Sequence, residues 1–374
     1  MTPLDDDLPE GTIFAPPARA AGPMAEAMGH YLVTIAGAEP GRRVEIDAAG
    51  VTIGRDAQQT MVIADAELSR RHARVWLQDD QAMAADLGST NGTFLDQQRI
   101  TSPILLREGQ VLRLGGQLLK YERRSRRDVQ RTRELDRDLQ LARNYVQALL
   151  PAPLVNGPVR TAWRYVPSAQ LGGDAFGYDW LDPETFVFYL VDVSGHGVGS
   201  AMHSVTILNV LRQRALPGVD FRDPSAVLSS LNDRFQMESH NGLFFTMWYG
   251  VYHTGDRTLT YGSAGHHASY LIGSDRDAAT PLGMPALMIG AMPSLTYEVR
   301  QTTLPAGSAL YVFSDGVFEI VTPDHRRWAL SDFVPLLLQP TTPGTTEPDR
   351  LYGAVTAAAE SLDDDFSLLV LTFT

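Results

Sequence analysis

The stretch from Phe186 to Ser194 runs Phe-Val-Phe-Tyr-Leu-Val-Asp-Val-Ser, an apolar segment with one acidic residue, Asp192, near its end. A short run of aromatic and β-branched residues predicts a buried strand. A carboxylate at the edge of such a strand is costly unless something pairs with it. Asp192 therefore indicates a functional requirement at the end of this strand.

Three further aspartates sit in comparable short motifs. They are Asp174 in Leu-Gly-Gly-Asp, Asp315 in Phe-Ser-Asp-Gly and Asp364 in Asp-Asp-Asp-Phe-Ser. Asp315 directly follows the apolar run 309–314, and Asp364 precedes the run 366–371. Each alone would be a turn or cap residue. Together, several converging carboxylates need a cation between them, and hard oxygen ligands suit Mg²⁺ or Mn²⁺.

In their order and separation, the four motifs resemble the PPM family of metal-dependent serine/threonine protein phosphatases. The similarity is greatest to the bacterial branch named after the stage II sporulation phosphatase. It extends from Trp163 to Phe373 and includes the stretches 242–251 and 261–267. For residues 153–374 the resemblance implies a layered α+β domain, in which two packed β-sheets are flanked by helices and metals bind at one end.

The resemblance also implies two Mn²⁺ or Mg²⁺ ions and assigns their ligands. Asp192 would bridge the ions, the Val193 carbonyl would complete one site, and Asp315 and Asp364 would bind the other ion. Asp174 would lie beside them as a ligand or through water. Asp192 and Asp315 would act in catalysis through a metal-bound hydroxide that attacks the phosphorus.

Two positions differ from the family pattern. Many relatives carry a second acid three residues after the first motif's aspartate, where this chain has Gly177, with Asp179 two residues further on. A third metal is therefore not assigned. His196 is farther along the chain from Asp192 than the histidine of eukaryotic relatives, so it is interpreted as a loop residue and given no catalytic role.

Composition excludes several classes of protein. The 374 residues contain no cysteine, which excludes disulfides and the cysteine-nucleophile phosphatases. Lys120 is the only lysine, which disfavours a lysine-dependent phosphate loop. The net charge of −13 disfavours binding to nucleic acid. No stretch is apolar enough to cross a membrane, so we expect a cytoplasmic, bacterial protein.

Residues 30–122 predict an all-β sandwich, since short strands alternate with polar turns. The expected strands are 31–35, 51–53, 73–77, 93–95 and 111–114. Three motifs lie among them: Ile53-Gly54-Arg55, Leu68-Ser69-Arg70-Arg71-His72 and Leu87-Gly88-Ser89-Thr90-Asn91-Gly92-Thr93-Phe94. In this order they resemble a forkhead-associated (FHA) domain, and such domains bind phosphothreonine peptides.

The FHA resemblance implies a site on the loops at one end of the sandwich. Arg55 would pair with the phosphate, Ser69 would donate its hydroxyl, and Arg70 and Thr90 would lie nearby. Asn91 would hold the peptide backbone. His72 would fix the loop from behind. Taken separately, the arginines would be ordinary surface residues and Asn91-Gly92 an ordinary turn.

Residues 123–152 predict a linker helix that is arginine-rich at its start and ends before Pro151. The positions Leu135, Leu139, Ala142, Val146 and Leu149 form an apolar seam at coiled-coil spacing. A homodimer through this helix is one interpretation, and a helix folded back onto one domain is the other. Residues 1–29, rich in proline, alanine and acid, predict a disordered tail.

The leading function is a metal-dependent phosphoserine/phosphothreonine protein phosphatase that its FHA domain recruits or regulates. Its partners would be a phosphothreonine protein at the FHA domain and a phosphoprotein substrate. In partner switching, relatives of this branch act on anti-sigma-factor antagonists. One alternative is a phosphothreonine-binding scaffold with an inactive phosphatase fold. Another is a hydrolase of cyclic nucleotides or other small phosphates.

Overall fold

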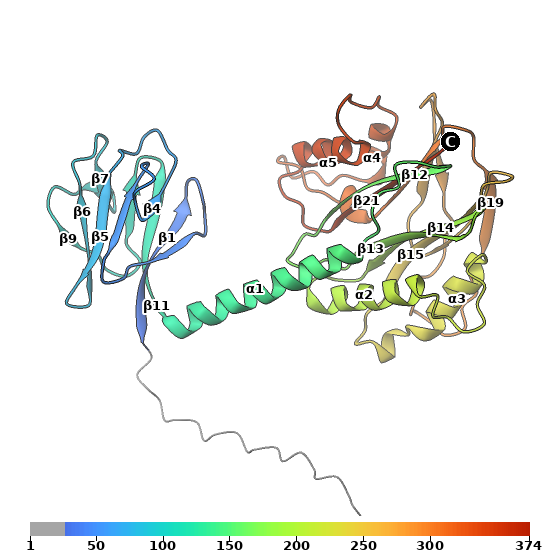
Figure 1. Cartoon of the computed structure of the whole chain (residues 1–374), viewed down its shortest axis with the longest axis horizontal. Helices are drawn as coiled ribbons and strands as arrows, with labels where there is room; N and C mark the ends of the chain where they lie inside the picture. Colours follow the sequence, from blue (N-terminus) through green and yellow to red (C-terminus); the bar gives the residue numbers. More distant parts are fainter. Residues whose placement is uncertain (1–26) are drawn as a thin grey trace, which may run out of the picture. The chain divides into compact units, whose positions relative to one another are not determined.

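The computed structural model of the chain describes residues 27–374, so the predicted disordered tail, 1–29, lies almost wholly outside the described residues. The chain divides into two compact units, residues 1–136 and 137–374, and the division falls inside one helix. Figure 1 shows both units. Among residues 27–374, no helix is both long and apolar enough to span a bilayer.

The first unit is a sandwich of two β-sheets, as the sequence predicted. One sheet has the order β2 (Arg43–Glu45), β1 (Met28–Ala36), β11 (Gln117–Ser125), β10 (Val111–Leu114), β7 (Thr93–Leu95) and β8 (Gln98–Arg99). The other has the order β4 (Met61–Val62), β3 (Val51–Gly54), β5 (Ala73–Gln78), β6 (Gln81–Asp86) and β9 (Ile104–Leu105). Alternate residues of these strands, among them Leu32, Ile53, Val75 and Leu112, fill one core between the sheets.

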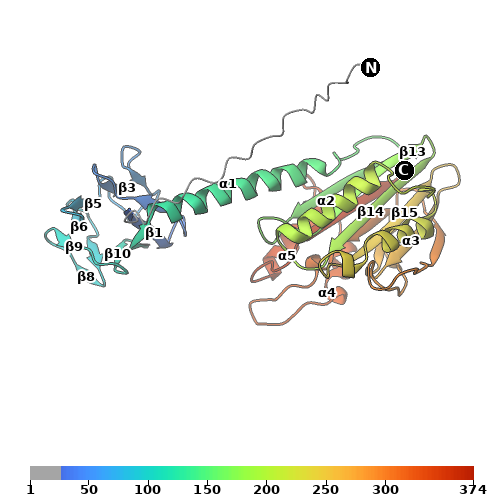
Figure 2. The same cartoon turned by 90° about the horizontal axis from the view of Figure 1, so that it is seen from below.

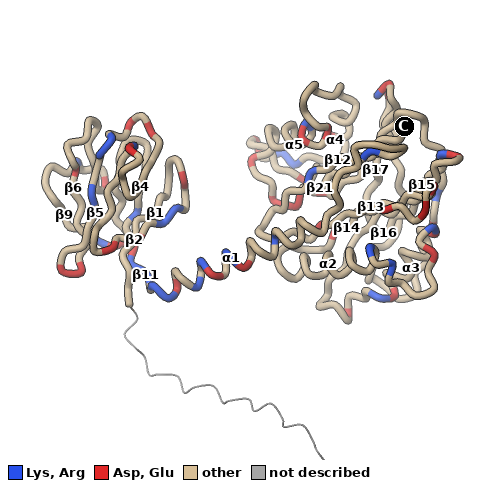
Figure 3. The backbone as a smooth tube through the Cα atoms, viewed as in Figure 1, with Lys and Arg blue, Asp and Glu red and all other residues tan. Residues whose placement is uncertain are grey.

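The predicted start of the linker helix was three residues too early. Arg123 and Arg124 belong to β11, where they pair with His30 and Gly29 of β1. Helix α1 therefore begins at Arg126 and ends at Leu149. Figure 3 shows that basic and acidic residues alternate along the first half of α1, which is a solvated helix surface.

The apolar seam of α1 is used inside the chain. Val146 is buried, and Leu139, Ala142 and Leu149 pack with it against Ala201 and Val205 of helix α2 (Val198–Arg212). The first seam residue, Leu135, stays exposed, as do Leu141 and Tyr145 outside the seam: 57%, 58% and 61% of their surface is accessible. Most of the seam is thus buried against the helix's own chain, as the folded-back interpretation expects.

The second unit contains two antiparallel five-stranded sheets with helices outside both, which confirms the predicted fold class. One sheet has the order β13 (Ala175–Asp182), β14 (Thr185–Val193), β15 (Phe245–His253), β16 (Thr258–Ala264) and β19 (Val299–Thr303). The other has the order β12 (Val159–Val166), β21 (Phe366–Phe373), β20 (Ala309–Phe313), β17 (Ser269–Ile272) and β18 (Ala279–Leu282).

Four α-helices cover the outer faces of these sheets, as Figures 1 and 2 show. Helix α2 packs on β13 and β14, and α3 (Pro224–Arg234) packs on β15 and β16. Helix α5 (Glu347–Ala358) packs on β12 and β21, and α4 (Leu330–Leu337) contacts β18. Two short 3₁₀ helices, η1 (Met237–Ser239) and η2 (Asp315–Val317), lie in loops.

Coverage of both faces explains the unbroken apolar runs in the sequence. In β21, Leu369 and Leu371 enter the core between the sheets, whereas Leu368 and Val370 enter a second core beneath α4 and α5. A strand with partners on each side has no position left for a solvent-facing polar residue. The aspartates therefore lie just beyond the strand ends or, in the case of Asp192, at the last residues of a strand.

Candidate functional site

Two pairs of antiparallel neighbours bring the predicted metal ligands to one end of the second unit. Asp174 immediately precedes β13, and Asp192 is the penultimate residue of β14, which pairs with β13. In the facing sheet, Asp315 follows β20 and Asp364 precedes β21, its hydrogen-bonded partner. Antiparallel pairing places the end of one strand beside the start of the next, so each sheet contributes two carboxylates.

These carboxylates interact strongly. Burial and then the Asp315 and Asp364 charges raise the pKa of Asp192 to about 8. Burial, followed by Asp364 and Glu319, raises the pKa of Asp315 to about 6. The pKa of Asp174 is raised well above its ordinary value by burial and then by Asp192. Mutual shifts of this kind require like charges close together in a poorly solvated place.

The donor chemistry of this cluster fits a divalent cation. Asp174 is 3% exposed, and its Oδ2 has no hydrogen-bond partner among the described residues. An orphaned buried carboxylate oxygen is the kind of ligand that Mg²⁺ and Mn²⁺ accept. Within residues 27–374, however, no three acidic or histidine side chains are spaced to hold an ion at once.

Glycines let the backbone approach this end of the sandwich closely. A Cβ at Gly173 would lie 2.7 Å from the Val193 carbonyl oxygen, the predicted backbone ligand. A Cβ at Gly316 would overlap the Asp365 carbonyl oxygen and lie 3.0 Å from the carbonyl carbon of Asp364. Neither position can accept a larger residue without moving the segments that carry the aspartates.

Asp365 is a residue of this site that the sequence did not single out. It is 3% exposed, and it accepts hydrogen bonds from the Ser168 amide at 2.8 Å and from the Gly173 amide at 2.6 Å. The neighbouring Asp364 accepts from the Asp365 amide at 2.7 Å. Asp365 therefore fixes the loop before Asp174, while Asp364 stays available to the cluster. Nothing in a run of three aspartates distinguishes these roles.

His266 connects the two sheets behind the carboxylates. Its Nδ1 lies 2.7 Å from the Thr246 hydroxyl, and its Nε2 lies 3.0 Å from the Phe313 carbonyl oxygen. Thr246 is the cross-strand partner of Asp192, and Phe313 is two residues before Asp315. Burial lowers the pKa of His266 well below its ordinary value, so the ring is neutral. The hydroxyl then donates to Nδ1 and Nε2–H donates to the carbonyl.

Three other positions resolve as follows. Glu319 is exposed, and its charge raises the pKa values of Asp192 and Asp315, so a further acid faces the cluster. His196 is exposed, and its charge lowers the pKa of Asp364 only as the smallest of four influences. Asp179, two residues after Gly177, forms an ion pair with Arg214 at 2.9 Å, away from the cluster.

In the first unit, three loops carry the predicted phosphopeptide residues. Arg55 follows β3, Ser69 and Arg70 lie between β4 and β5, and Thr90 and Asn91 lie between β6 and β7. Arg55, Arg70, Thr90 and Asn91 are all exposed, and Ser69 is half-buried. The structure thus brings all five to one end of the sandwich and leaves their polar groups accessible.

Hydrogen bonds join these loops to one another. The Ser69 hydroxyl donates to the Thr90 hydroxyl at 3.3 Å and accepts from the Thr90 amide at 2.9 Å. Asn91 donates to the Glu67 carbonyl at 2.8 Å. Buried His72 accepts from the Ser69 amide at 3.2 Å through Nδ1, and its Nε2 lies 3.2 Å from the Gly92 carbonyl. His72 therefore supports two loops from behind.

Asp86 organises the third loop and was not identified from the sequence. Its carboxylate accepts from the Ser89 hydroxyl at 2.6 Å, from the Thr93 hydroxyl at 2.7 Å and from the Gly88 amide at 2.8 Å. Burial alone would raise the pKa of Asp86, but these hydrogen bonds outweigh it, and the pKa lies below its ordinary value. Asp86 is thus held as a charged acceptor.

Comparison with known proteins agrees with this geometry. Residues 51–115 match the FHA domain family, and residues 182–374, just over half of the chain, match the family "Stage II sporulation protein E (SpoIIE)". The chain is 25% identical over 261 residues to phosphoserine phosphatase RsbU of Bacillus subtilis, which covers 69% of this chain and 76% of RsbU. Over 85 residues it is 39% identical to FhaB of Mycobacterium tuberculosis, covering 23% of this chain and 55% of FhaB.

Two solved structures share the fold of the second unit. The SiaA-PP2C domain of Pseudomonas aeruginosa superposes with a TM-score of 0.56 at 20% identity, over 65% of this chain and 98% of that domain. The PP2C phosphatase domain and regulatory fragment of SpoIIE from Bacillus subtilis give a TM-score of 0.51 at 18% identity, over 59% of this chain and 64% of that one.

Replacing Asp86 by Asn should destabilise the first unit by about 2 kcal/mol, because two hydroxyl donors lose a charged acceptor. The folded-state pKa is depressed, so the loss should be full at neutral pH and should shrink as pH falls below the ordinary value of 3.8. Hydrogen exchange of β3 and β5 in the full chain measures it. Asp79→Asn, in an exposed turn, is the control, and equal protection in both variants would contradict the prediction.

Divalent cations should stabilise the second unit by relieving repulsion among the carboxylates. At saturating Mn²⁺ the gain should be about 2–3 kcal/mol, a Tm rise of roughly 5–10 °C over the protein in chelator. Asp192→Asn should raise the Tm in chelator and lose most of the Mn²⁺ response. Asp256→Asn, in an exposed turn at the far end of β15, should behave like the wild type. If the wild-type Tm is the same in Mn²⁺ and in chelator, the metal site is refuted.

Proposed function

Because the chain belongs to the stage II sporulation protein E (SpoIIE) family and also carries an FHA domain, we propose that it is a metal-dependent protein serine/threonine phosphatase in a signalling pathway. Its FHA domain recruits or regulates it through phosphothreonine. The observation that supports catalysis best is the cluster of coupled carboxylates contributed by both sheets.

In this proposal Asp192 would contact both ions. The Val193 carbonyl would bind one of them, Asp315 and Asp364 would bind the other, and Asp174 would lie beside them. When bound, two Mn²⁺ or Mg²⁺ ions would activate a water and neutralise the phosphoryl oxygens. The chain's own part is positioning. Asp365 fixes the loop before Asp174. The His266 bridge joins β15, the partner of the strand that carries Asp192, to β20, which precedes Asp315. No side chain is assigned as the nucleophile.

The substrate we propose is a phosphoprotein, specifically a phosphorylated antagonist of an anti-sigma factor. Similarity to RsbU, whose name records a phosphoserine phosphatase, supports the phosphoprotein class. The FHA neighbour also favours a protein over a small phosphate ester. With a net charge of −13 and a cytoplasmic location proposed, nucleic acid and membrane are not among its partners.

At the FHA domain, Arg55 pairs with the phosphate of a phosphothreonine, and Ser69, Arg70 and Thr90 supply further donors. Asn91 holds the backbone of the peptide. The accessible side chains on three joined loops support this assignment. Charge-assisted hydrogen bonds from a guanidinium are the strong contribution to phosphate binding.

One observation favours the alternative of a phosphothreonine-binding scaffold with an inactive phosphatase fold. Among residues 27–374, no three side chains are already spaced to hold an ion. A scaffold would retain the FHA site and the sandwich but would never close the carboxylates around a metal. Measurement of metal-dependent turnover separates the two functions.

We also propose a homodimer through the exposed face of α1. Four of the five seam residues pack on α2, so the contact would use the remaining one, Leu135, together with Leu141 and Tyr145. These three are among the most exposed large apolar side chains of the described chain. Apolar residues on one helix that find no partner within their own chain are typical of helix–helix association.

The purified full chain should hydrolyse a chromogenic phosphate ester with Mn²⁺ or Mg²⁺ and not in chelator. Asp192→Asn should lower kcat by about 10³-fold or more, because a ligand shared by both ions is lost. Asp256→Asn should retain wild-type turnover. If neither metal supports turnover while Mn²⁺ still raises the Tm, the scaffold function is favoured.

A degenerate phosphothreonine peptide library should bind the full chain, and the matching phosphoserine library should bind more weakly. Arg55→Ala should weaken the binding at least ~10-fold through loss of a charged hydrogen bond. Arg74→Ala provides the matched control, since Arg74 donates to Ala49 at the other end of the sandwich. Equal affinity of the Arg55 and Arg74 variants would exclude the assigned site.

Light scattering of the full chain should give the mass of a dimer, and Leu141→Glu with Tyr145→Glu should give a monomer. Point substitutions are preferable to deleting the helix, because its seam supports the fold of α2. Arg137→Glu, on the same helix, should leave the mass unchanged. A monomeric wild type across the concentration range would rule out the dimer.

A further inference from the structure

A recess of about 250 Å³ in the second unit begins three residues after Asp315. A single stretch of chain forms it, and its lining residues are Phe318, Glu319, Arg327, Trp328, Ala329 and Leu330. None of the predicted metal ligands lines it. Apart from Phe318, all of these residues are exposed or half-buried, so their side chains are accessible to a ligand.

One wall of the recess is continuous with the carboxylate cluster. The Phe318 and Glu319 amides both donate to the Asp315 carbonyl, at 2.9 and 2.8 Å. The Glu319 charge contributes to the raised pKa values of Asp315 and Asp192, so its carboxylate lies within electrostatic reach of both. A ligand in the recess is therefore a neighbour of the phosphoryl group that the cluster would hold in the proposed reaction.

A short hairpin forms the other wall. The Trp328 amide donates to the Ile320 carbonyl at 3.0 Å, and a bridge joins Val321 to Arg327. The Glu360 amide donates to the Val321 carbonyl at 2.8 Å, which ties the hairpin to the segment that leads into β21. The recess is thus built by hydrogen-bonded backbone on both sides.

Two side chains of the recess carry donors without acceptors. Arg327 is exposed, and within residues 27–374 its guanidinium group forms no hydrogen bond and no ion pair, not even with Glu319 of the same recess. The Trp328 indole N–H likewise has no hydrogen-bond partner in that part of the chain. Both groups can only donate. The recess therefore favours a ligand that accepts hydrogen bonds and carries negative charge, as a carboxylate does.

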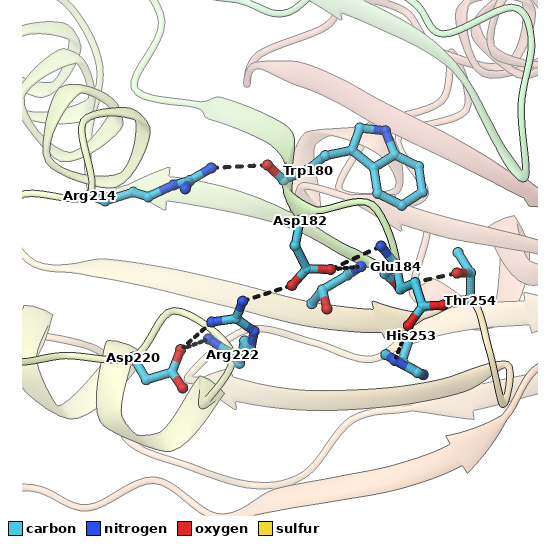
Figure 4. A network of polar contacts seen from close by, with 9 residues as sticks. Trp180, Asp182, Glu184, Arg214, Asp220, Arg222, His253 and Thr254 are labelled. Atoms are coloured by element: carbon cyan, nitrogen blue, oxygen red, sulfur yellow. Dashed lines mark hydrogen bonds and ion pairs between the residues drawn. The ribbon is translucent and has the colours of Figure 1, made fainter.

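Other arginines of the second unit have their charge compensated. Arg326, the residue before Arg327, pairs with Asp332 at 2.9 Å. Arg222 pairs with Asp182 at 2.7 Å in the network of Figure 4. Arg327 has the same charge and no such partner in the described residues, so its charge is available to a ligand.

Apolar surface surrounds these donors. The Phe318 ring is fixed by edge-on contacts with the rings of His267 and Phe313, whose centroids are 5.1 and 6.2 Å away. Trp328 and Leu330 pack partly against the core beneath α4 and α5, and the rest of their surface stays open. Such a surface can hold the methylene groups of a side chain while the charged end of that side chain reaches the donors.

We propose that the recess binds an acidic side chain of the phosphoprotein substrate, next to the phosphorylated residue, and that Arg327 selects it. This inference rests on the proposed phosphatase function. The carboxylate of the substrate would accept from Arg327 and Trp328, and its methylene groups would contact Leu330. Glu319 and the cluster are negatively charged, so without Arg327 an acidic side chain would be repelled.

The test compares two pools of phosphoserine peptides as substrates of the full chain with Mn²⁺. In one pool the two residues on each side of the phosphoserine are Asp or Glu, and in the other they are Asn or Gln. Phosphoserine is used because the FHA domain is proposed to select phosphothreonine. The wild type should have a kcat/KM about 5–10-fold higher for the acidic pool, as expected of a charged hydrogen bond at a partly exposed site. Arg327→Gln should lower this ratio to one or below, and a ratio is insensitive to a general loss of activity.

Arg326→Gln is the matched control and should keep the wild-type ratio. A chromogenic phosphate ester in the same assay reports on the catalytic centre by itself. If the ester is hydrolysed but the wild type uses both pools equally, or Arg327→Gln keeps the wild-type ratio, the inference is overturned while the phosphatase function stands. Equal loss of the ratio in the Arg326 and Arg327 variants would overturn it as well. If neither the ester nor the peptides are hydrolysed, the proposed function fails and the inference fails with it.

Discussion

Repulsion among carboxylates at one end of a rigid sandwich is the constraint on which the second unit depends. Asp174, Asp192, Asp315 and Asp364 come from four strand ends, and each of them has its pKa raised. The strands cannot separate to relieve the repulsion, because both faces of both sheets are covered. The fold therefore holds an unfavourable arrangement in place at the cost of local stability, a common property of functional sites.

Several uncharged or locally compensated groups keep that arrangement in register. His266 joins the partner strand of Asp192 to the strand that precedes Asp315, and it does so as a neutral ring. Asp365 fixes the loop before Asp174 by accepting amide hydrogen bonds. Gly173 and Gly316 permit the backbone contacts. Apart from Asp365, the neighbours that position the four clustered aspartates are therefore uncharged.

Sequence patterns predicted most of this fold, and the misses have physical causes. The apolar run 309–314 forms β20 as far as Phe313, and the run 366–371 lies wholly within β21, because coverage on both faces makes these strands apolar. Strand β13 was missed because it is an edge strand containing Gly177, Tyr178 and Asp179, which follow no simple alternation. Helix α4 was missed because it contains Pro335, a residue that normally argues against a helix at that position.

Other misses depended on contacts distant in sequence. Arg123 and Arg124 have helix-forming neighbours, but pairing with β1 keeps them in a strand. Asp364 and Asp365 differ in role because of the amides that donate to them. The amide that distinguishes Asp365 belongs to Gly173, which is 192 residues away in the sequence. The seam of α1 has the spacing of a coiled coil, and α2 of the same chain satisfies it. Periodicity identifies an apolar face but not its partner.

The joined loops of the FHA domain have a consequence for how quickly a partner can be recognised. Ser69, Thr90 and Asn91 are already held by hydrogen bonds, with His72 behind them. A peptide that arrives finds its contacts in place, so little rearrangement slows the encounter, and the lifetime of the complex is set by dissociation.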